Sequence, residues 1–475
     1  MTYPWPSSPP SDSDRAAYAD AEIRPFWQDT VPAREPHVPL NTRIEADLCI
    51  VGAGFTGLWA ALHAKELDPG REVVVLEATR CGDGASSRNG GFLQASVTHG
   101  LSNGLSRFPD EIEQLERLGM ANFAELQADL ERYGIDAEFE NSGELDVALA
   151  EHELDDLAAA AGQARSYGHD VQLFDQAEVR SAVNSPLYKG GMLDRTGSAI
   201  VNPAKLVDGL RQAALRSGVQ IFEYTPVRKL ERTRSGIRAI AHAGLVDARV
   251  ALIATSAYPP LLQAIGHYVA PVYDYALMTE PLTAEQLRSI GWESRAGIGD
   301  VANQFHYYRL SADNRILFGG YDAVYRYGGP VRPDLDDHDP TFGTLSQHFF
   351  TVFPQLQGLR FSHRWGGAID TCSRFSVFFG SAFKGRAVYA LGYTGLGVGA
   401  SRFGARTGLD LLDGRETEAT RTTLVNSRPL PFPPEPLRSA VIQLTRNRLA
   451  AADRNDGRRG LWLRTLDRAG LGFDS

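Results

Sequence analysis

The stretch "DLCIVGAGFTGLWAAL", residues 47–62, decides the fold of this 475-residue chain. Its first part is a short apolar run, which is typical of a buried parallel strand, and its last part has the apolar spacing of a helix. Between the two lies a G-x-G-x-x-G sequence, "GAGFTG", residues 52–57. A strand, a glycine-rich turn and a helix in this order predict a Rossmann-like dinucleotide-binding unit.

The three glycines of this motif have separate physical roles. Gly52 permits the tight turn, Gly54 lets a pyrophosphate approach the main chain, and Gly57 lets the helix pack closely on the strand. Phe55 and Thr56 lie in the first helical turn, whose free N–H groups and partial positive charge attract phosphate. We therefore expect all five residues to take part in cofactor binding.

A second apolar run, "EVVVLEA", residues 72–78, predicts the neighbouring strand. It ends at Glu77 and Ala78, and Glu77 lies 20 residues after Gly57. An acidic residue at this spacing binds ribose hydroxyls in dinucleotide folds. The alternative is a glycine-rich turn that binds nothing.

The stretch "GASSRNGGF", residues 84–92, has side chains too small for a core strand and too many glycines for a helix interior. It follows the second strand and so emerges at the carboxyl end of the sheet, where ligands of open α/β sheets bind. We predict that its backbone is bare so that a large flat ligand can lie against it, with Arg88 and Asn89 supplying hydrogen-bond donors. An ordinary surface loop is the alternative. The candidate binding residues are Ser86, Ser87, Arg88, Asn89, Gly90 and Gly91.

A second glycine-rich turn, "GYTGLGVG", residues 392–399, also follows an apolar run and opens a helix. The N-terminus of such a helix stabilises the negative charge of a reduced flavin. No second complete G-x-G-x-x-G unit with an acidic partner occurs, so we expect no separate NAD(P)H site and expect electrons to come from an organic substrate. Candidate residues here and at the end of the strand at 249–258 are Gly392, Thr394, Gly395, Leu396, Gly397, Ala254 and Thr255.

With these motifs, four further stretches make the chain resemble the D-amino-acid-oxidase-type FAD oxidoreductases over residues 24–415. They are "VNPAKLVDGL" (201–210), "TPVRKLE" (225–231), "ALIATSAY" (251–258) and "RWGGAIDTCSRFSVFFG" (364–380). Within that family the resemblance is to the subgroup similar to gamma-glutamylputrescine oxidase. It implies an α/β fold, in which a Rossmann-like FAD-binding domain is interleaved with an α+β substrate domain whose antiparallel sheet roofs the flavin.

The resemblance also implies an activity. The C–N bond of an amine or amino acid would be oxidised by hydride transfer to flavin N5. The imine would then be hydrolysed to an aldehyde or keto product with ammonia or an amine, and oxygen would reoxidise the flavin to give hydrogen peroxide. One alternative is an FAD-dependent dehydrogenase or demethylase of N-methyl amino acids that passes electrons to a carrier. Another is an assembly protein in which FAD is only structural.

Several binding residues are implied by the resemblance alone. Val227 matches the position whose backbone contacts adenine, and the turn from Gly395 to Gly397 matches the one that faces flavin O2. Relatives with covalent flavin use a histidine in the loop after the second strand, or a cysteine near the position of Ile369. Here that loop holds Arg88 and Asn89, and Cys372 is out of register, so we expect non-covalent FAD.

Candidates on the substrate side come from "NQFHYYRLSADNRILFGGYDAVY", residues 303–325, which predicts two strands around a turn. Alternation places Phe305, Tyr307 and Arg309 on one face and His306 and Tyr308 on the other, and one face should roof the flavin. An arginine there could clamp a carboxylate. The alternative is a strand of structural residues. The catalytic candidates are His306, Tyr308, Arg309 and Trp365. Asp370 and Arg374, four residues apart, could pair with each other.

We expect an N-terminal arm, two interleaved domains and a C-terminal helical extension. The predicted boundaries are 1–44 for the arm, 45–100, 190–260 and 360–415 for the FAD-binding domain, 101–189 and 261–359 for the substrate domain, and 416–475 for the extension. The extension is rich in arginine. Val441, Leu444 and Leu449 suggest an amphipathic helix that packs on the body of the protein, with a membrane surface or a partner as the alternative.

Composition narrows the class of protein. The net charge of −10 argues against nucleic acid as the main partner, and the three cysteines form no metal-binding spacing. We find no apolar run long enough to span a membrane and expect no signal peptide, hence a cytoplasmic enzyme. The expected partners are a small amine or amino acid and molecular oxygen. The sequence does not indicate the oligomeric state.

Overall fold

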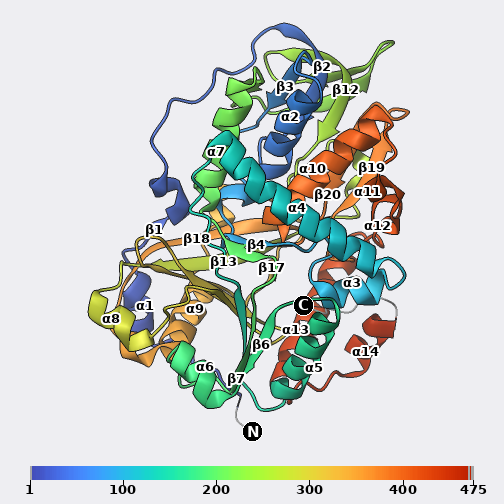
Figure 1. The fold of residues 1–475 in the computed structure, drawn as a ribbon. Helices are drawn as coiled ribbons and strands as arrows, with labels where there is room; N and C mark the ends of the chain where they lie inside the picture. The colour runs from blue at the N-terminus through green and yellow to red at the C-terminus, as the bar shows by residue number, and fades with distance from the viewer. Residues whose placement is uncertain (1–2, 469–470, 472–475) are drawn as a thin grey trace.

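The computed structural model describes residues 3–468 and 471. Two large sheets form the framework (Figure 1). The upper part contains β2, β3 and β12 with helices α2 and α10, and the lower part contains β13 and β18 with α6, α8 and α9. The long helix α4 (Ile112–Tyr133) runs across the upper part and packs on α10. The fold is therefore the mixed α/β architecture with two sheets that the sequence predicts.

The upper sheet has eight strands with a parallel core around β2. The predicted strand–turn–helix–strand unit is present as β2, α2 and β3, and β20 lies parallel to the end of β12. A short antiparallel extension, β10 and β11, continues the sheet beyond β12, and β19 pairs with β20. The bounds are β2 Arg43–Val51, β3 Val73–Leu76, β9 Gln220–Phe222, β10 Lys229–Arg232, β11 Ile237–Ile240, β12 Leu245–Ile253, β19 Phe378–Ala382 and β20 Ala387–Leu391.

Helix α2 (Phe55–Leu67) is buried on all sides through most of its length. It packs on α10 (Gly397–Asp413) and on α7 (Pro203–Arg216) as well as on the sheet. A helix enclosed in this way is apolar all round rather than amphipathic, which explains the run of Leu, Trp and Ala in its sequence. The two glycine-rich turns therefore precede two helices, α2 and α10, that pack on each other.

The lower sheet has ten strands, mostly antiparallel, as expected of a substrate domain. Its order is β1 (Glu22–Ile23), β18 (Phe361–Thr371), β13 (Ala270–Thr279), β16 (Ile316–Gly320), β15 (His306–Leu310), β14 (Gly297–Asp300), β5 (Glu144–Ala148), β7 (Gly190–Asp194) and β6 (Val171–Phe174), with β17 (Val324–Tyr325) also on β13. Residues 339–352 form helix α9 (Asp339–Val352), which buries Phe342, Leu345, Phe349 and Phe350 in the core of this half.

Two domain boundaries differ from the expectation. β7 and β18 fall in segments assigned to the FAD-binding domain, but both pair within the lower sheet. The N-terminal arm is built into that same half, because α1 (Asp12–Tyr18) packs on α9 and β1 extends the sheet at β18.

The remaining elements join and cover these sheets. The C-terminal extension forms α11 (Glu418–Arg421), α12 (Thr423–Asn426), α13 (Leu437–Asp453) and α14 (Leu461–Arg468). Among the described residues, no helix is long and apolar enough to cross a membrane. The other elements are β4 (Phe92–Gln94), β8 (Ser198–Ile200), α3 (Leu101–Arg107), α5 (Glu153–Ser166), α6 (Gln176–Ala182) and α8 (Ala284–Ile290).

Candidate cofactor and substrate site

A cavity of about 1480 Å³ lies where the two sheets meet. Its walls come from the turn after β2, the loop after β3, the end of β12, the turn before α10, and strands β13 and β18. Pockets for one small molecule usually measure about 300–1,000 Å³. The volume therefore suits two ligands side by side, a large cofactor and a substrate.

The first glycine turn has the geometry expected of a phosphate cradle. A Cβ on Gly52, whose φ is +104°, would lie 2.4 Å from the Ala254 carbonyl oxygen, and one on Gly57 would lie 1.9 Å from the Gly52 carbonyl oxygen. Gly54 lines the cavity, and the nearest obstacle to a Cβ there is Ser86 Oγ at 2.8 Å. The turn and the helix contact thus require glycine at 52 and 57, while Gly54 leaves room beside the helix N-terminus.

Glu77 braces this turn from the end of β3. Its carboxylate accepts hydrogen bonds from the Ala53 N–H at 2.7 Å and from the Thr79 N–H at 3.0 Å. Burial raises the pKa of Glu77, and these backbone donors oppose that rise. Glu77 and Ala78 both line the cavity, so the acidic group is placed where the sequence predicted it.

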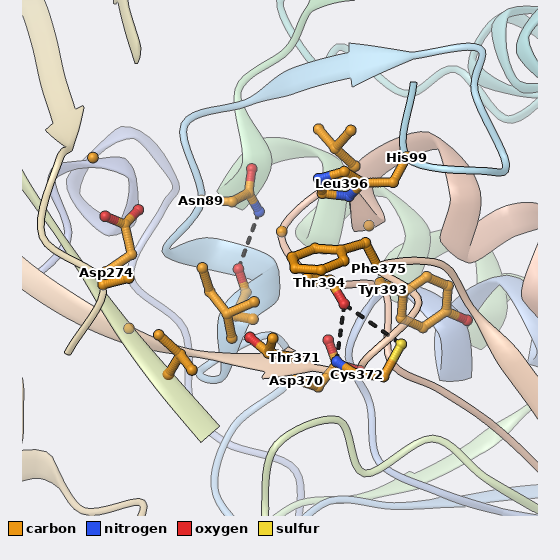
Figure 2. Close-up of a pocket in the computed structure, with 18 of the residues that line it drawn as sticks. Asn89, His99, Asp274, Asp370, Thr371, Cys372, Phe375, Tyr393, Thr394 and Leu396 are labelled. Atoms are coloured by element: carbon orange, nitrogen blue, oxygen red, sulfur yellow. Dashed lines mark hydrogen bonds between the residues drawn. The ribbon is translucent and has the colours of Figure 1, made fainter. Parts of the chain in front are cut away.

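The loop at residues 84–92 also lines the cavity, but its polar side chains have internal partners. Arg88 donates to Asp336 at 2.6 Å and to the Gly366 carbonyl at 2.9 Å. The Asn89 amide, which Figure 2 labels, donates to the carbonyls of Ala85 and Ser86 at 3.0 Å. Arg88 therefore ties the loop to Asp336 and β18, and Asn89 ties it to itself, so both side chains hold the loop in place; their donation to a ligand stays a prediction.

The second glycine turn is held by β18. Asp370 accepts from the Gly392 N–H at 2.7 Å, and the Cys372 N–H donates to Thr394 Oγ1 at 3.1 Å (Figure 2). Asp370 therefore does not pair with Arg374, whose guanidinium donates instead to backbone carbonyls, among them that of Leu424 at 2.8 Å. These contacts aim the N-terminus of α10 at the cavity.

Most of the predicted cofactor residues share the cavity wall. They are Gly52, Gly54, Phe55, Thr56, Glu77, Ala78, Ser86, Arg88, Asn89, Gly90, Val227, Ala254, Thr255, Thr394, Gly395, Leu396 and Gly397. Four others, Gly57, Ser87, Gly91 and Gly392, do not line it. A Cβ on Gly91 would lie 2.1 Å from the Val201 carbonyl oxygen, and one on Gly392 would lie 2.7 Å from the Phe378 ring. Gly91 and Gly392 therefore pack closely on residues behind the cavity wall and do not face the cavity themselves.

The chemistry of this wall fits a flavin dinucleotide. The first-turn N–H groups of α2 and α10 have no intrahelical acceptors, and both helix N-termini border the cavity. Thr255 Oγ1 is buried at the wall and has no hydrogen-bond partner among the described residues. One helix terminus suits a pyrophosphate, and the other suits a ring that gains negative charge on reduction.

On the substrate side, the structure selects the face of β15 that carries Tyr307. Its hydroxyl donates to Asp274 Oδ2 at 2.6 Å, and both residues line the cavity. Asp274 comes from β13 and lies across the drawn pocket from Cys372 and Thr394 (Figure 2). Burial raises the pKa of Asp274 to about 6. Sequence reasoning missed Asp274, although a lone carboxylate within the apolar strand "APVYDYALMT" was a usable signal.

Three catalytic candidates lie elsewhere. His306 and Tyr308 are buried in the lower core, where His306 contacts Asp300 at 2.8 Å and Tyr308 contacts Tyr188 at 2.7 Å. Arg309 is also buried, and its guanidinium donates to the Val201 carbonyl at 2.6 Å. None of the three lines the cavity, so the expectation that they contact substrate is corrected.

Trp365 does reach the cavity wall. Its indole N–H donates to the Arg88 carbonyl at 2.9 Å, and its side chain is almost fully buried. It therefore holds the loop at residues 84–92 against β18.

Acidic side chains outnumber arginines on the cavity wall. The described lining residues include three arginines, and each has a carboxylate partner: Arg88 with Asp336, Arg446 with Asp322, and Arg459 with Asp467. Carboxylates are more numerous: Glu77, Glu144, Asp146, Glu153, Asp156, Asp194, Asp274, Asp300, Asp322, Asp370 and Asp453. Burial raises the pKa of several of these carboxylates, to about 7 for Glu144 and about 8 for Asp300, so the wall carries fewer negative charges than it has acidic side chains. The described part of the wall still offers an anionic substrate no arginine without a carboxylate partner.

Comparison with known proteins gives a consistent result. Residues 47–409 match the family model described as FAD dependent oxidoreductase. Gamma-glutamylputrescine oxidoreductase of Escherichia coli is 32% identical over 80% of this chain and 86% of that protein. The probable oxidoreductase OrdL of Haemophilus influenzae is 28% identical over 81% of this chain and 86% of that protein.

Solved structures agree with the fold. Glycine oxidase from Geobacillus kaustophilus superposes with a TM-score of 0.64 at 22% identity, covering 78% of this chain and 96% of that one. L-proline dehydrogenase from P. horikoshii superposes with a TM-score of 0.63 at 18% identity, covering 82% and 96%.

Proposed function

Because this chain belongs to the FAD dependent oxidoreductase family, we propose that it oxidises the C–N bond of an amine that is cationic in solution. FAD supplies the two-electron acceptor that takes a hydride from the carbon beside the nitrogen. Water then hydrolyses the imine to an aldehyde or ketone and releases ammonia or an amine. Molecular oxygen is the proposed electron acceptor, with hydrogen peroxide as the product.

The observation that carries the choice of an amine is that each described arginine of the cavity wall is already paired with a carboxylate. An amino-acid substrate needs a cationic partner for its carboxylate, and arginine is the usual one. The three described arginines of the wall are paired with carboxylates, and Arg309 is occupied by backbone carbonyls behind it. The excess of carboxylates favours a substrate without an uncompensated negative charge. The 32% identity to gamma-glutamylputrescine oxidoreductase supports a polar alkylamine as the substrate class.

Asp274 is the proposed partner of the substrate ammonium. Its carboxylate lies in the cavity and accepts from the Tyr307 hydroxyl at 2.6 Å, which fixes its orientation. An ammonium has no lone pair to expel a hydride, so the bound amine must lose a proton before oxidation. A carboxylate with a pKa of about 6 can hold the cation on entry and accept that proton.

FAD is proposed to be held without a covalent bond. The only thiol among the described lining residues is Cys372, and its Sγ is 3.3 Å from the carbonyl oxygens of both Ser376 and Gly392. Burial also raises the pKa of Cys372, which disfavours the reactive thiolate.

Anaerobic flavin bleaching tests the proposal. The purified holoenzyme would be mixed, without oxygen, with alkylamines, diamines, amino acids and N-methyl amino acids, and its absorbance near the flavin maximum would be followed. We expect alkylamines and diamines to bleach the flavin fastest. Bleaching by amino acids alone would contradict the assignment, and release of peroxide on admission of air separates an oxidase from a dehydrogenase.

A further inference from the structure

The C-terminal extension forms part of the cavity wall although it lies beyond the residues that match the family model. Helix α13 presents one stripe of side chains to the cavity at helical spacing: Val441, Ile442, Thr445, Arg446, Leu449 and Asp453. Leu444, Asn447 and Arg448, on the other side of the helix, are exposed and do not line it. Of the apolar residues that suggested an amphipathic helix, Val441 and Leu449 therefore face the cavity, whereas Leu444 is exposed on the other side.

Two carboxylates fix α13 at its ends to loops of the lower sheet. Glu435, just before the helix, accepts from the Tyr325 hydroxyl at 2.7 Å and from the Gly328 N–H at 3.0 Å. Asp453, its last residue, accepts from the Asn303 N–H at 3.1 Å and from the Gln304 N–H at 3.0 Å. A helix held at both ends is a fixed wall rather than a loose tail.

The turn after α13 closes the cavity against α5. A Cβ on Gly457 would lie 3.0 Å from the His152 ring, so this turn packs directly beside the start of α5. Figure 1 shows α13 and α14 beside α5 at the lower right of the molecule. From α5, Leu157 and Ala160 also line the cavity. This part of the cavity therefore has apolar side chains on two sides. They alternate with the polar or charged groups Glu153 and Asp156 of α5 and Thr445, Arg446 and Asp453 of α13.

We propose that α13 is the specificity-determining wall of the substrate chamber, and that Val441 and Leu449 contact the alkyl chain of the amine beyond the reacting carbon. This inference rests on the proposed amine oxidation. The apolar residues of α13 and α5 accept methylene groups, while Asp274 holds the nitrogen in the part of the cavity shared with the cofactor wall. The position of α13 then limits the length of the chain.

Substitutions at Val441 that make the side chain larger or smaller test whether α13 limits the length of the substrate. Val441→Trp should shorten the chamber and lower kcat/KM for long amines at least tenfold, with little change for the shortest amine. Val441→Ala should shift the preference toward longer or bulkier amines. Leu444→Trp, on the exposed side of the same helix, is the matched control and should leave the preference unchanged. Flavin content confirms that each variant is folded.

A measurement without any amine separates this inference from the proposed function. Dithionite is a small reductant that bleaches flavin by itself, so its rate reports access to the cavity. The double variant Glu435→Ala, Asp453→Ala, which frees both ends of α13, should speed bleaching several-fold, and Val441→Trp should slow it. If no amine bleaches the parent enzyme but the dithionite rate rises in the double variant and falls in Val441→Trp, the proposed amine substrate is wrong. The inference that α13 forms a wall of the chamber is then still supported. If amine preference and dithionite rate are both unchanged in the Val441 and double variants, the inference is overturned.

Discussion

The guanidinium of Arg309 lies over the indole ring of Trp27, 5.0 Å from its centroid, and donates to the Val201 carbonyl at 2.6 Å. Trp27 in turn donates to the Asn89 carbonyl at 2.9 Å. One buried arginine thus joins the N-terminal arm, the lower sheet and the loop beside the cofactor wall. The alternation of side chains along the strand suggested that Arg309 binds a substrate carboxylate. Its guanidinium instead contacts Val201 and Trp27 inside the protein.

Arg309→Lys should therefore affect stability more than substrate binding. Lysine cannot reproduce the planar fork or its stacking, and the lost contacts of a buried charged donor are worth roughly 1–3 kcal/mol. We expect a lower free energy of unfolding in urea, with KM nearly unchanged for the folded enzyme. Arg249→Lys, at an exposed position, is the control. A large rise in KM at normal stability would restore Arg309 as a substrate residue.

Gly54→Val should abolish FAD binding. A Cβ at this position meets Ser86 Oγ at 2.8 Å, and the two methyl groups beyond it would occupy the space at the N-terminus of α2. Flavin content per polypeptide after purification measures the effect. Gly162→Val, in helix α5 with no atom within 4 Å of its Cβ position, controls for the substitution itself. Full flavin content in Gly54→Val would remove this glycine from the binding site.

Activity should depend on pH through Asp274. Burial raises the pKa of Asp274 to about 6, so its carboxylate is charged above pH 6 and progressively neutral below it. We expect kcat/KM to fall as the pH drops through 6, because the site then loses the charge that holds the substrate ammonium. Asp274→Asn should lower kcat/KM roughly ten- to hundredfold, as expected for a charge-assisted contact worth about 1.5–3 kcal/mol, and remove that limb of the profile.

The control for Asp274 is Asp156→Asn, which changes another carboxylate of the cavity wall, on α5. An acid limb that persists in Asp274→Asn would assign the pH dependence to a different group.

Acid precipitation should release the flavin. With Cys372 buried and its Sγ near two backbone carbonyls, we expect a yellow supernatant and a colourless pellet. Cys372→Ser should then retain its flavin content. A covalent link to this sulfur would be indicated if the pellet of the parent protein stays yellow while the pellet of Cys372→Ser is colourless.

The sequence by itself determined the cofactor half of the protein. The close contact of Gly57 with Gly52 and the hydrogen bond from Ala53 to Glu77 lie within one strand–turn–helix–strand unit, whereas the contact of Gly52 with Ala254 brings in the distant strand β12. Backbone sterics and the order of strand, turn and helix leave few alternatives there. The glycine-rich turn before α10 is also predictable from its local sequence. Its position beside the N-terminus of α2, however, depends on the packing of the two helices.

Only the tertiary structure decided the substrate half. Alternation along β15 separates Tyr307 from His306 and Tyr308, but which face meets the cavity depends on the strands paired with it, β16 and β14. Arg309 shares the face of Tyr307 yet is drawn to carbonyls of distant segments. Asp274 and α13 reach the cavity through contacts between residues far apart in the chain, such as Asp453 with Asn303. Side-chain spacing cannot encode these contacts, because they form only when separate elements pack together.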